Sequence, residues 1–226
     1  MAVIHRTTLQ PTKLELLAGW LPTRAWHTGG EARPVRAGGF RLDDPAGEVG
    51  IEFMAVTDGE GDGAASYLVP LTYRAAPLAG AEKALIGTAE HGVLGKRWIY
   101  DGTHDPVLVA QLYALLTSRA QAQAQSLTDT PDLAVDVTRI EAGTGDDAEL
   151  VRVTEGSDHT DVTVRTPGAS ETLTLRVRRV LGVGADPAPG AAGGVTAPWE
   201  LAGGTTVRGE FFAAFGPVDS TVSTPS

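Results

Sequence analysis

The second half of the chain alternates between apolar and polar residues, and this pattern constrains the fold more than any other feature of the sequence. Near residue 175, for example, Leu173, Leu175 and Val177 point to one side of an extended chain, and the residues between them are polar. Successive side chains of a β-strand point to opposite faces. The pattern therefore predicts an antiparallel meander with one buried face, built from four strands at Leu133–Ala142, Glu149–Glu155, Thr160–Thr166 and Thr172–Leu181.

Two helices are predicted in the first half of the chain. Thr12 and Glu15 fit a capping box, and the helix that they open is expected to stop at Leu21, because Pro22 disfavours the α conformation of the residue before it. A longer helix is predicted from Asp105 to about Gln125. Asp105 is a suitable N-cap with proline after it, an apolar stripe that includes Leu112 and Leu115 follows, and an Ala/Gln tail favours helix.

The remaining elements are strands and loops. Glu48–Thr57 and Ala65–Arg74 are predicted to form a hairpin, with further short strands at Leu85–Ile86, Lys96–Asp101 and Val207–Phe215. The Gly/Ala/Pro-rich stretch 182–198 is predicted to be an exposed flexible loop, and the chain closes with a polar tail. A turn-rich boundary near residue 128 divides the chain into segments 1–128 and 129–226. The predicted fold class is α+β.

Composition excludes several classes of function. The formal charge of −10 argues against a nucleic-acid partner, since nucleic-acid binders concentrate Lys and Arg on one face. The chain has no cysteine, which excludes disulfides, Cys-ligated zinc and thiol nucleophiles. No apolar run approaches the ~20 residues of a membrane-spanning helix, and residues 1–10 lack an apolar signal region. A cytoplasmic location without a membrane partner is the expectation.

Motifs that could carry chemistry have a structural alternative in each case. His104-Asp105 is either a ligand pair or acid/base dyad, or a helix cap, and the cap is favoured. Trp20 and Trp26 are either a platform for a sugar ring or core residues, and the core is favoured. The acidic pairs are interpreted as turn residues rather than catalytic carboxylates, namely Asp43-Asp44, Asp129/Asp132 and Asp146-Asp147.

Three segments, in order, carry a resemblance to the maltokinase N-terminal cap family. They are Trp20–Trp26 followed by Gly29-Gly30, then Ser66–Leu71 with its Val-Pro-Leu ending, and Tyr100–Pro106 at the start of the long helix. The resemblance covers roughly residues 10–120 and departs from the family at Ala25 and His27. It implies a cystatin-like cap, an antiparallel sheet around a long helix, followed by a β-rich region that resembles a kinase N-lobe.

The same resemblance extends weakly into residues 133–181. The segment 173–179 resembles the strand that carries the nucleotide-binding lysine, with Arg176 in the lysine position, and Glu155–Asp158 resembles the phosphate-contacting turn. Arginine replaces a compact ammonium poorly. The metal-binding and acceptor-orienting residues of a kinase C-lobe are not recognised after Val180.

These observations lead to the expectation of a non-catalytic interaction or regulatory module related to sugar kinases of maltose, trehalose and glycogen metabolism. Its expected partner is a protein or a second copy of the chain, with a sugar as a possible ligand. The alternatives are a carbohydrate- or small-ligand-binding protein and a partial kinase completed in trans. No catalytic, cofactor-binding or metal-binding residue is assigned from the sequence, no cofactor is expected, and the ligand or partner surface is not located.

Overall fold

A computed structural model describes residues 9–125, 130–141, 148–166, 172–184 and 188–216. Within these ranges the two α-helices are α1 (Lys13–Trp20) and α2 (Pro106–Leu116). The strands are β1 (Leu9–Gln10), β2 (Val35–Asp43), β3 (Gly50–Asp58), β4 (Ala65–Arg74), β5 (Leu85–His91), β6 (Gly95–Asp101), β7 (Asp136–Thr138), β8 (Glu149–Glu155), β9 (His159–Arg165), β10 (Thr172–Arg178), β11 (Gly193–Glu200) and β12 (Thr206–Phe215). In the same ranges no helix is both long and apolar enough to cross a membrane.

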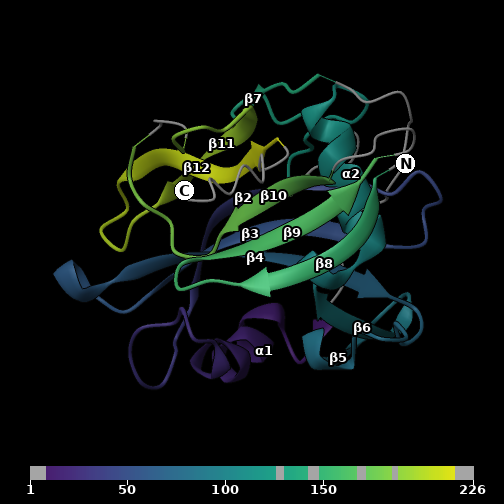
Figure 1. Cartoon of the computed structure of the whole chain (residues 1–226). Helices are drawn as coiled ribbons and strands as arrows, with labels where there is room; N and C mark the ends of the chain where they lie inside the picture. Colours follow the sequence, from purple (N-terminus) through teal and green to yellow (C-terminus); the bar gives the residue numbers. More distant parts are fainter. Residues whose placement is uncertain (1–8, 126–129, 142–147, 167–171, 185–187, 217–226) are drawn as a thin grey trace, which may run out of the picture.

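The strands form one continuous antiparallel sheet that curls into two layers. Its order is β1-β5-β6-β4-β3-β2-β11-β12-β10-β9-β8, and β7 adds to β11. Strands β8, β9 and β10 lie in front of β2, β3 and β4, with α2 at one end of the two layers and α1 below them (Figure 1). The molecule is thus mostly antiparallel sheet with little helix, which agrees at this level with a β-rich cap-like fold.

The segment that follows β10 closes the sheet against β4. Strand β6 pairs only with the second half of β4, from Leu71 to Arg74. The first half of β4 is bonded instead by the segment after β10: Leu68 donates its N–H to the Arg179 carbonyl, and Leu181 donates to the Ser66 carbonyl, at 3.0 and 2.8 Å. This junction places the end of β10 beside the end of β6.

The main hydrophobic core fills the space between the two layers. Phe40 and Phe53 stack at 4.7 Å between centroids, and Phe212 meets Phe53 edge-on at 4.9 Å. Leu112 and Leu115 of α2 lie in the same core and are 1% and 3% exposed, which confirms the predicted buried stripe. One sheet and one core contain residues from both sides of the predicted boundary. A division into two family units at this point remains a prediction.

A second core lies between α1 and the other face of β3 and β4. The two strands read as continuous apolar runs because one face meets each core. Thr12 and Glu15 form the predicted capping box, and α1 ends at Trp20, where a 3₁₀ turn containing Pro22 begins. Trp20 and Trp26 meet edge-on at 5.7 Å and are 6% and 2% exposed. The prediction that both indoles are buried is confirmed.

The long helix is shorter than predicted. It ends at Leu116, and Ser118 adopts a left-handed backbone with φ of 64°. The Ala/Gln tail does not continue the helix, because Gln123 and Arg41 exchange two backbone hydrogen bonds of 2.9 Å. Pairing with β2 overrides the intrinsic helix propensity of the tail.

The prediction of a loop at 182–198 is wrong for its second half. β11 begins at Gly193 and pairs with β12, and Val195 and Ala197 are buried. Strand β2 lies in a region for which no strand was predicted. The strand predicted at 133–142 is reduced to β7, which pairs with β11 rather than with β8. The meander of the front layer therefore consists of β8, β9 and β10.

Candidate functional site

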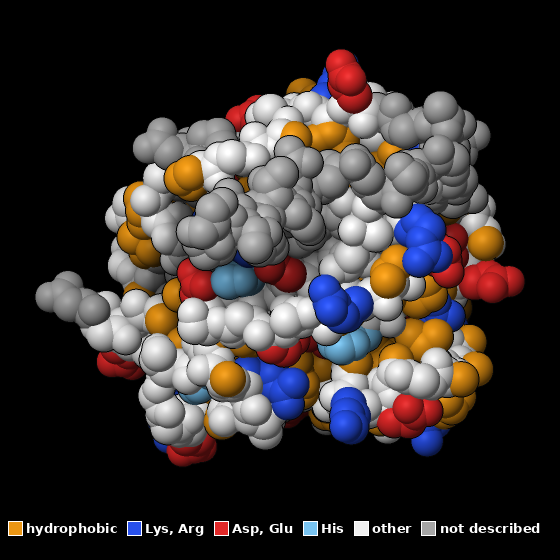
Figure 2. Space-filling model, viewed as in Figure 1, with side chains coloured by type: hydrophobic (Ala, Val, Ile, Leu, Met, Phe, Trp, Pro, Cys, Tyr) orange, Lys and Arg blue, Asp and Glu red, His pale blue; other side chains and the backbone are white. Residues whose placement is uncertain are grey.

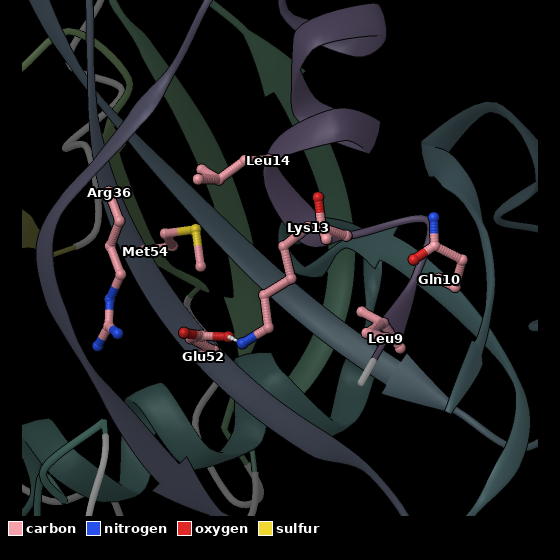
Figure 3. A pocket seen from close by; sticks show the side chains of 8 residues that line it. Leu9, Gln10, Lys13, Leu14, Arg36, Glu52 and Met54 are labelled. Atoms are coloured by element: carbon pink, nitrogen blue, oxygen red, sulfur yellow. Dashed lines mark hydrogen bonds and ion pairs between the residues drawn. The ribbon is translucent and has the colours of Figure 1, made fainter. Parts of the chain in front are cut away.

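A cavity of about 410 Å³ lies between α1, the first strand and the β2–β3 pair. Leu9, Leu14 and Met54 supply its apolar lining, and Lys13, Arg36 and Glu52 supply charges. In Figure 3, Arg36 lies on one side of Met54 and Glu52, and Lys13 reaches Glu52 from the other side. An apolar wall with a few converging polar groups is typical of small-molecule sites.

Glu52 is the buried centre of this cavity. Its Oε2 accepts hydrogen bonds from Lys13 Nζ at 2.5 Å and from the Tyr73 hydroxyl at 2.7 Å, and its Oε1 accepts from Gln125 Nε2 at 3.1 Å. Burial raises the pKa of the Tyr73 hydroxyl well above its ordinary value, and the Glu52 charge raises it further. Tyr73 therefore stays a neutral donor to the carboxylate.

The cations of the cavity retain unused hydrogen-bond donors. Lys13 is 38% exposed at its side chain. Arg36 is exposed and binds the Gln125 Oε1 through Nε and Nη2, while its Nη1 meets no acceptor among the residues that the structure describes. Two cations and one carboxylate thus line the cavity, and the net charge of these three groups is positive.

A second polar region contains arginines of segment 173–179, including Arg176. Arg176 and Asp161 form a bidentate pair with bonds of 2.7 and 2.8 Å, and Arg178 donates to Glu210 at 3.0 Å. The hydrogen bond between Arg176 and Asp161 raises the pKa of that guanidinium. Both arginines lie on the polar face of β10, as the alternation predicted.

Arg179 lies at the junction between the two layers and is completely buried. It donates to the Oδ2 of Asp101 at 2.5 Å and to the hydroxyls of Thr103 and Thr160 at 3.1 and 2.7 Å. Its guanidinium also stands 5.3 Å from the centre of the Trp26 ring. This arginine joins the end of β6 to the front layer through Nε and Nη2, while its Nη1 is buried without a hydrogen-bond partner among the described residues.

Asp101, His104 and Glu155 bring potential metal ligands within 4.8 Å of one another. Asp101, however, already uses both oxygens, since Oδ2 accepts from Arg179 and Oδ1 accepts from the Thr103 N–H and hydroxyl. A divalent cation would have to displace a buried guanidinium from this carboxylate. The arrangement fits an ion-pair network better than a metal centre.

The favoured cap interpretation of His104-Asp105 is confirmed. Asp105 caps α2 by accepting from the Val107 N–H at 3.0 Å, and its two oxygens also hold Arg74 at 2.6 Å each. His104 ends the 3₁₀ turn that precedes the helix.

The predicted turn role is confirmed for Asp44 and Asp132, whereas Asp43 is the last residue of β2 and pairs with Gly50 of β3. Asp44 accepts three backbone N–H groups of the turn before β3, and Asp132 accepts one from Ala134. Asp129, Asp146 and Asp147 lie outside the described residues. At the start of β9, His159 contacts Asp158 at 2.7 Å and Asp161 at 3.7 Å, and Figure 2 shows a histidine beside acidic side chains on this face.

Sequence reasoning missed the residues of the cavity. Glu52 interrupts the apolar run of β3, and a charge in a strand buried on both faces requires a partner. That signal marked the residue, but its partners Lys13, Tyr73 and Gln125 come from three other segments and only the fold brings them together.

The comparisons with known proteins agree with part of this description. No curated protein matches the chain. The family model described as the maltokinase N-terminal cap domain matches residues 20–105, which span α1's last residue, β2 to β6 and the turn before α2. The resemblance inferred from the sequence is thereby confirmed: residues 20–105 match the maltokinase N-terminal cap domain family.

Proposed function

We propose that this protein is a non-catalytic interaction or regulatory module related to the N-terminal part of sugar kinases of maltose, trehalose and glycogen metabolism, working in the cytoplasm. In this proposal residues 1–128 correspond to a cystatin-like cap and residues 129–226 to a region like a kinase N-lobe. The observation that carries it concerns segment 173–179, which resembles the nucleotide-binding strand. Each arginine of this segment forms an ion pair with an acidic residue of the same chain. Arg176 binds Asp161, Arg178 binds Glu210 and Arg179 binds Asp101.

The turn between β8 and β9 supports the same proposal. This turn resembles the phosphate-contacting turn of the family, but the Gly156 N–H donates to the His159 carbonyl at 2.8 Å and closes a hairpin. A side chain at position 156 would approach the His159 ring to 2.6 Å, so the ring occupies the space beside the glycine. A phosphate would have to displace these contacts.

The turn between β5 and β6 offers a surface for a partner. Val93 and Leu94 are 62% and 46% exposed at its tip. The His91 Nδ1 accepts the backbone N–H groups of both residues, at 3.3 and 3.0 Å, and holds the turn in shape. Adjacent exposed apolar side chains on a fixed turn favour contact with a protein surface.

Nucleotide binding tests the non-catalytic part of the proposal. Titration with a fluorescent ATP analogue and Mg²⁺ should give no saturable signal, and phosphate transfer to maltose, glucose or glucosamine should equal a control without protein. Transfer above that control, abolished by Arg176→Ala, would contradict the proposal.

Association tests the interaction part. Light scattering at increasing protein concentration, and binding assays with purified enzymes of maltose, trehalose and glycogen metabolism, should detect a complex that Val93→Ser/Leu94→Ser weakens. Val183→Ser is the matched control, because Val183 is 67% exposed on another loop. A chain that stays monomeric and binds none of these enzymes would refute an interaction module.

A second candidate function is the binding of a small ligand, which the cavity beside α1 favours. The buried indoles do not support a sugar platform, because stacking on a sugar needs an open ring face and both indoles are covered.

A further inference from the structure

We propose that the cavity beside α1 binds a small organic anion, a carboxylate or a phosphate monoester that carries a short apolar chain. The inference goes beyond the interaction module proposed above and does not depend on it. It rests on the charges, the apolar lining and the existing hydrogen-bond partners of Glu52 in this cavity.

The charges of the cavity favour an anion. Lys13 and Arg36 line it together with Glu52, so the lining carries one positive charge in excess. Lys13 has three N–H donors and gives one to Glu52, and Arg36 binds Gln125 through Nε and Nη2, which leaves its Nη1 with no acceptor among the described residues. A guanidinium with donors in a plane matches the two oxygens of a carboxylate or phosphate.

The existing partners of Glu52 disfavour a cationic ligand. Both of its oxygens already accept hydrogen bonds, from Lys13 and Tyr73 on one oxygen and from Gln125 on the other. A ligand ammonium would compete with Lys13 and Gln125 for this carboxylate and would meet the positive charges of Lys13 and Arg36. An anion instead adds to donors that are still open.

The apolar lining favours a ligand with a hydrocarbon part. Leu9, Leu14 and Met54 lie beside the charged groups, and Figure 3 shows Met54 and Leu14 adjacent to each other between Arg36 and Lys13. Inorganic phosphate would use only the charged side of the cavity. A chain of a few carbons would cover this lining and exclude water from it.

Four six-carbon probes separate the effect of the head-group charge from that of the hydrocarbon part. They are hexanoate, hexyl phosphate, hexanol and hexylamine, each titrated into the full chain by isothermal titration calorimetry. At least one of the two anions should bind saturably, and hexanol and hexylamine should bind about tenfold more weakly or not at all. Comparison of hexanoate with hexyl phosphate identifies the head group. Saturable binding of hexylamine or hexanol as tight as that of both anions, or no binding of either anion, would overturn the proposal.

Substitutions locate the site. Arg36→Gln should weaken binding of the favoured anion about tenfold, and Lys13→Gln should also weaken it, because each removes a charged donor. Arg33→Gln is the matched control, since the Arg33 side chain is 82% exposed and its guanidinium pairs with Glu31 at the surface. Circular dichroism establishes that each variant is folded. Equal affinity in Arg36→Gln, Lys13→Gln and Arg33→Gln would place the anion elsewhere and refute the assignment of this cavity.

Discussion

Arg179 and Arg36 show how one residue type serves two purposes in this molecule. Arg179 is fully buried at the junction of the two layers, where Asp101, Thr103 and Thr160 accept its hydrogen bonds. Arg36 is exposed at the edge of the cavity and binds only the amide oxygen of Gln125 among the described residues. The only donor of Arg179 without a partner among the described residues, Nη1, is buried and out of reach of a ligand, whereas the donors left on Arg36 are at the surface.

The difference follows from desolvation. A buried guanidinium needs an opposite charge and hydrogen-bond acceptors inside the protein, so these partners must be present before any ligand arrives. An exposed guanidinium keeps its water, and its ion pairs add little to stability. Burial therefore separates the arginines that hold the structure from those that can exchange partners.

The largest expected effect comes from Arg179→Met. The change leaves the Asp101 carboxylate, 4% exposed, buried beside an apolar side chain. Removal of one partner of a buried ion pair costs about 3–5 kcal/mol. Urea unfolding followed by circular dichroism should show this loss.

A double variant gives the control for this prediction. Arg179→Met/Asp101→Asn removes the orphaned charge and should recover part of the lost stability. An Arg179→Met protein as stable as the wild type would mean that the junction is hydrated and that the comparison with Arg36 fails.

Arg176→Met should have an intermediate effect. Arg176 and Asp161 are 30% and 25% exposed at their side chains, so water can solvate the carboxylate that remains. We expect a loss of about 1 kcal/mol, the upper end for solvent-accessible pairs. The same urea titration measures it, and a loss as large as that of Arg179→Met would show that exposure does not rank these arginines.

Arg36→Gln should change the free energy of unfolding by less than about 0.5 kcal/mol, as is usual for surface substitutions. Only contacts with Gln125 are removed, and both side chains remain accessible to water. The expected result is a nearly unchanged urea midpoint. A loss above about 1 kcal/mol would assign Arg36 to the structure and leave it little freedom to bind a ligand.

Local sequence signals predicted the elements that local chemistry determines. The capping box of α1, the Asp105 cap of α2 and the extent of β4 follow from neighbouring residues, and all are present. The predicted end of α2 was wrong because the segment of good helix formers after Leu116 pairs with β2 instead. That pairing joins residues about eighty positions apart, so the helix propensity of the local sequence does not indicate it.

Strand β11 shows a different limit of prediction from the sequence. Its glycines resemble a loop, but a side chain at Gly193 or Gly194 would approach the carbonyl oxygen of Thr138 or Phe212 to 2.5 Å. The small residues thus serve close approach of neighbouring strands, which composition alone does not distinguish from flexibility. The cavity was missed for a related reason, since Lys13, Arg36, Glu52 and Gln125 converge only in the folded chain.

The smallest expected effect lies at the Asp158–His159 contact, close to Arg179 but at the surface. The hydrogen bond from His159 lowers the pKa of the Asp158 carboxyl below its ordinary value of 3.8, and the charges of His159 and Arg178 act in the same direction. A carboxyl with a lowered folded-state pKa stabilises the fold above its unfolded pKa, and this contribution is lost as the pH falls through the folded-state pKa.

At about pH 7 Asp158→Asn should therefore lower the melting temperature by roughly 1 °C, because the side chain is half exposed and surface pairs are weak. As the pH falls from about 7 through the folded-state pKa, the wild-type carboxyl becomes protonated and the difference should vanish. Melting curves of both proteins across this range measure the effect. A difference that stays constant with pH would show that the asparagine acts through the backbone of the turn, where the Asp158 carbonyl accepts the N–H groups of Arg179 and Val180.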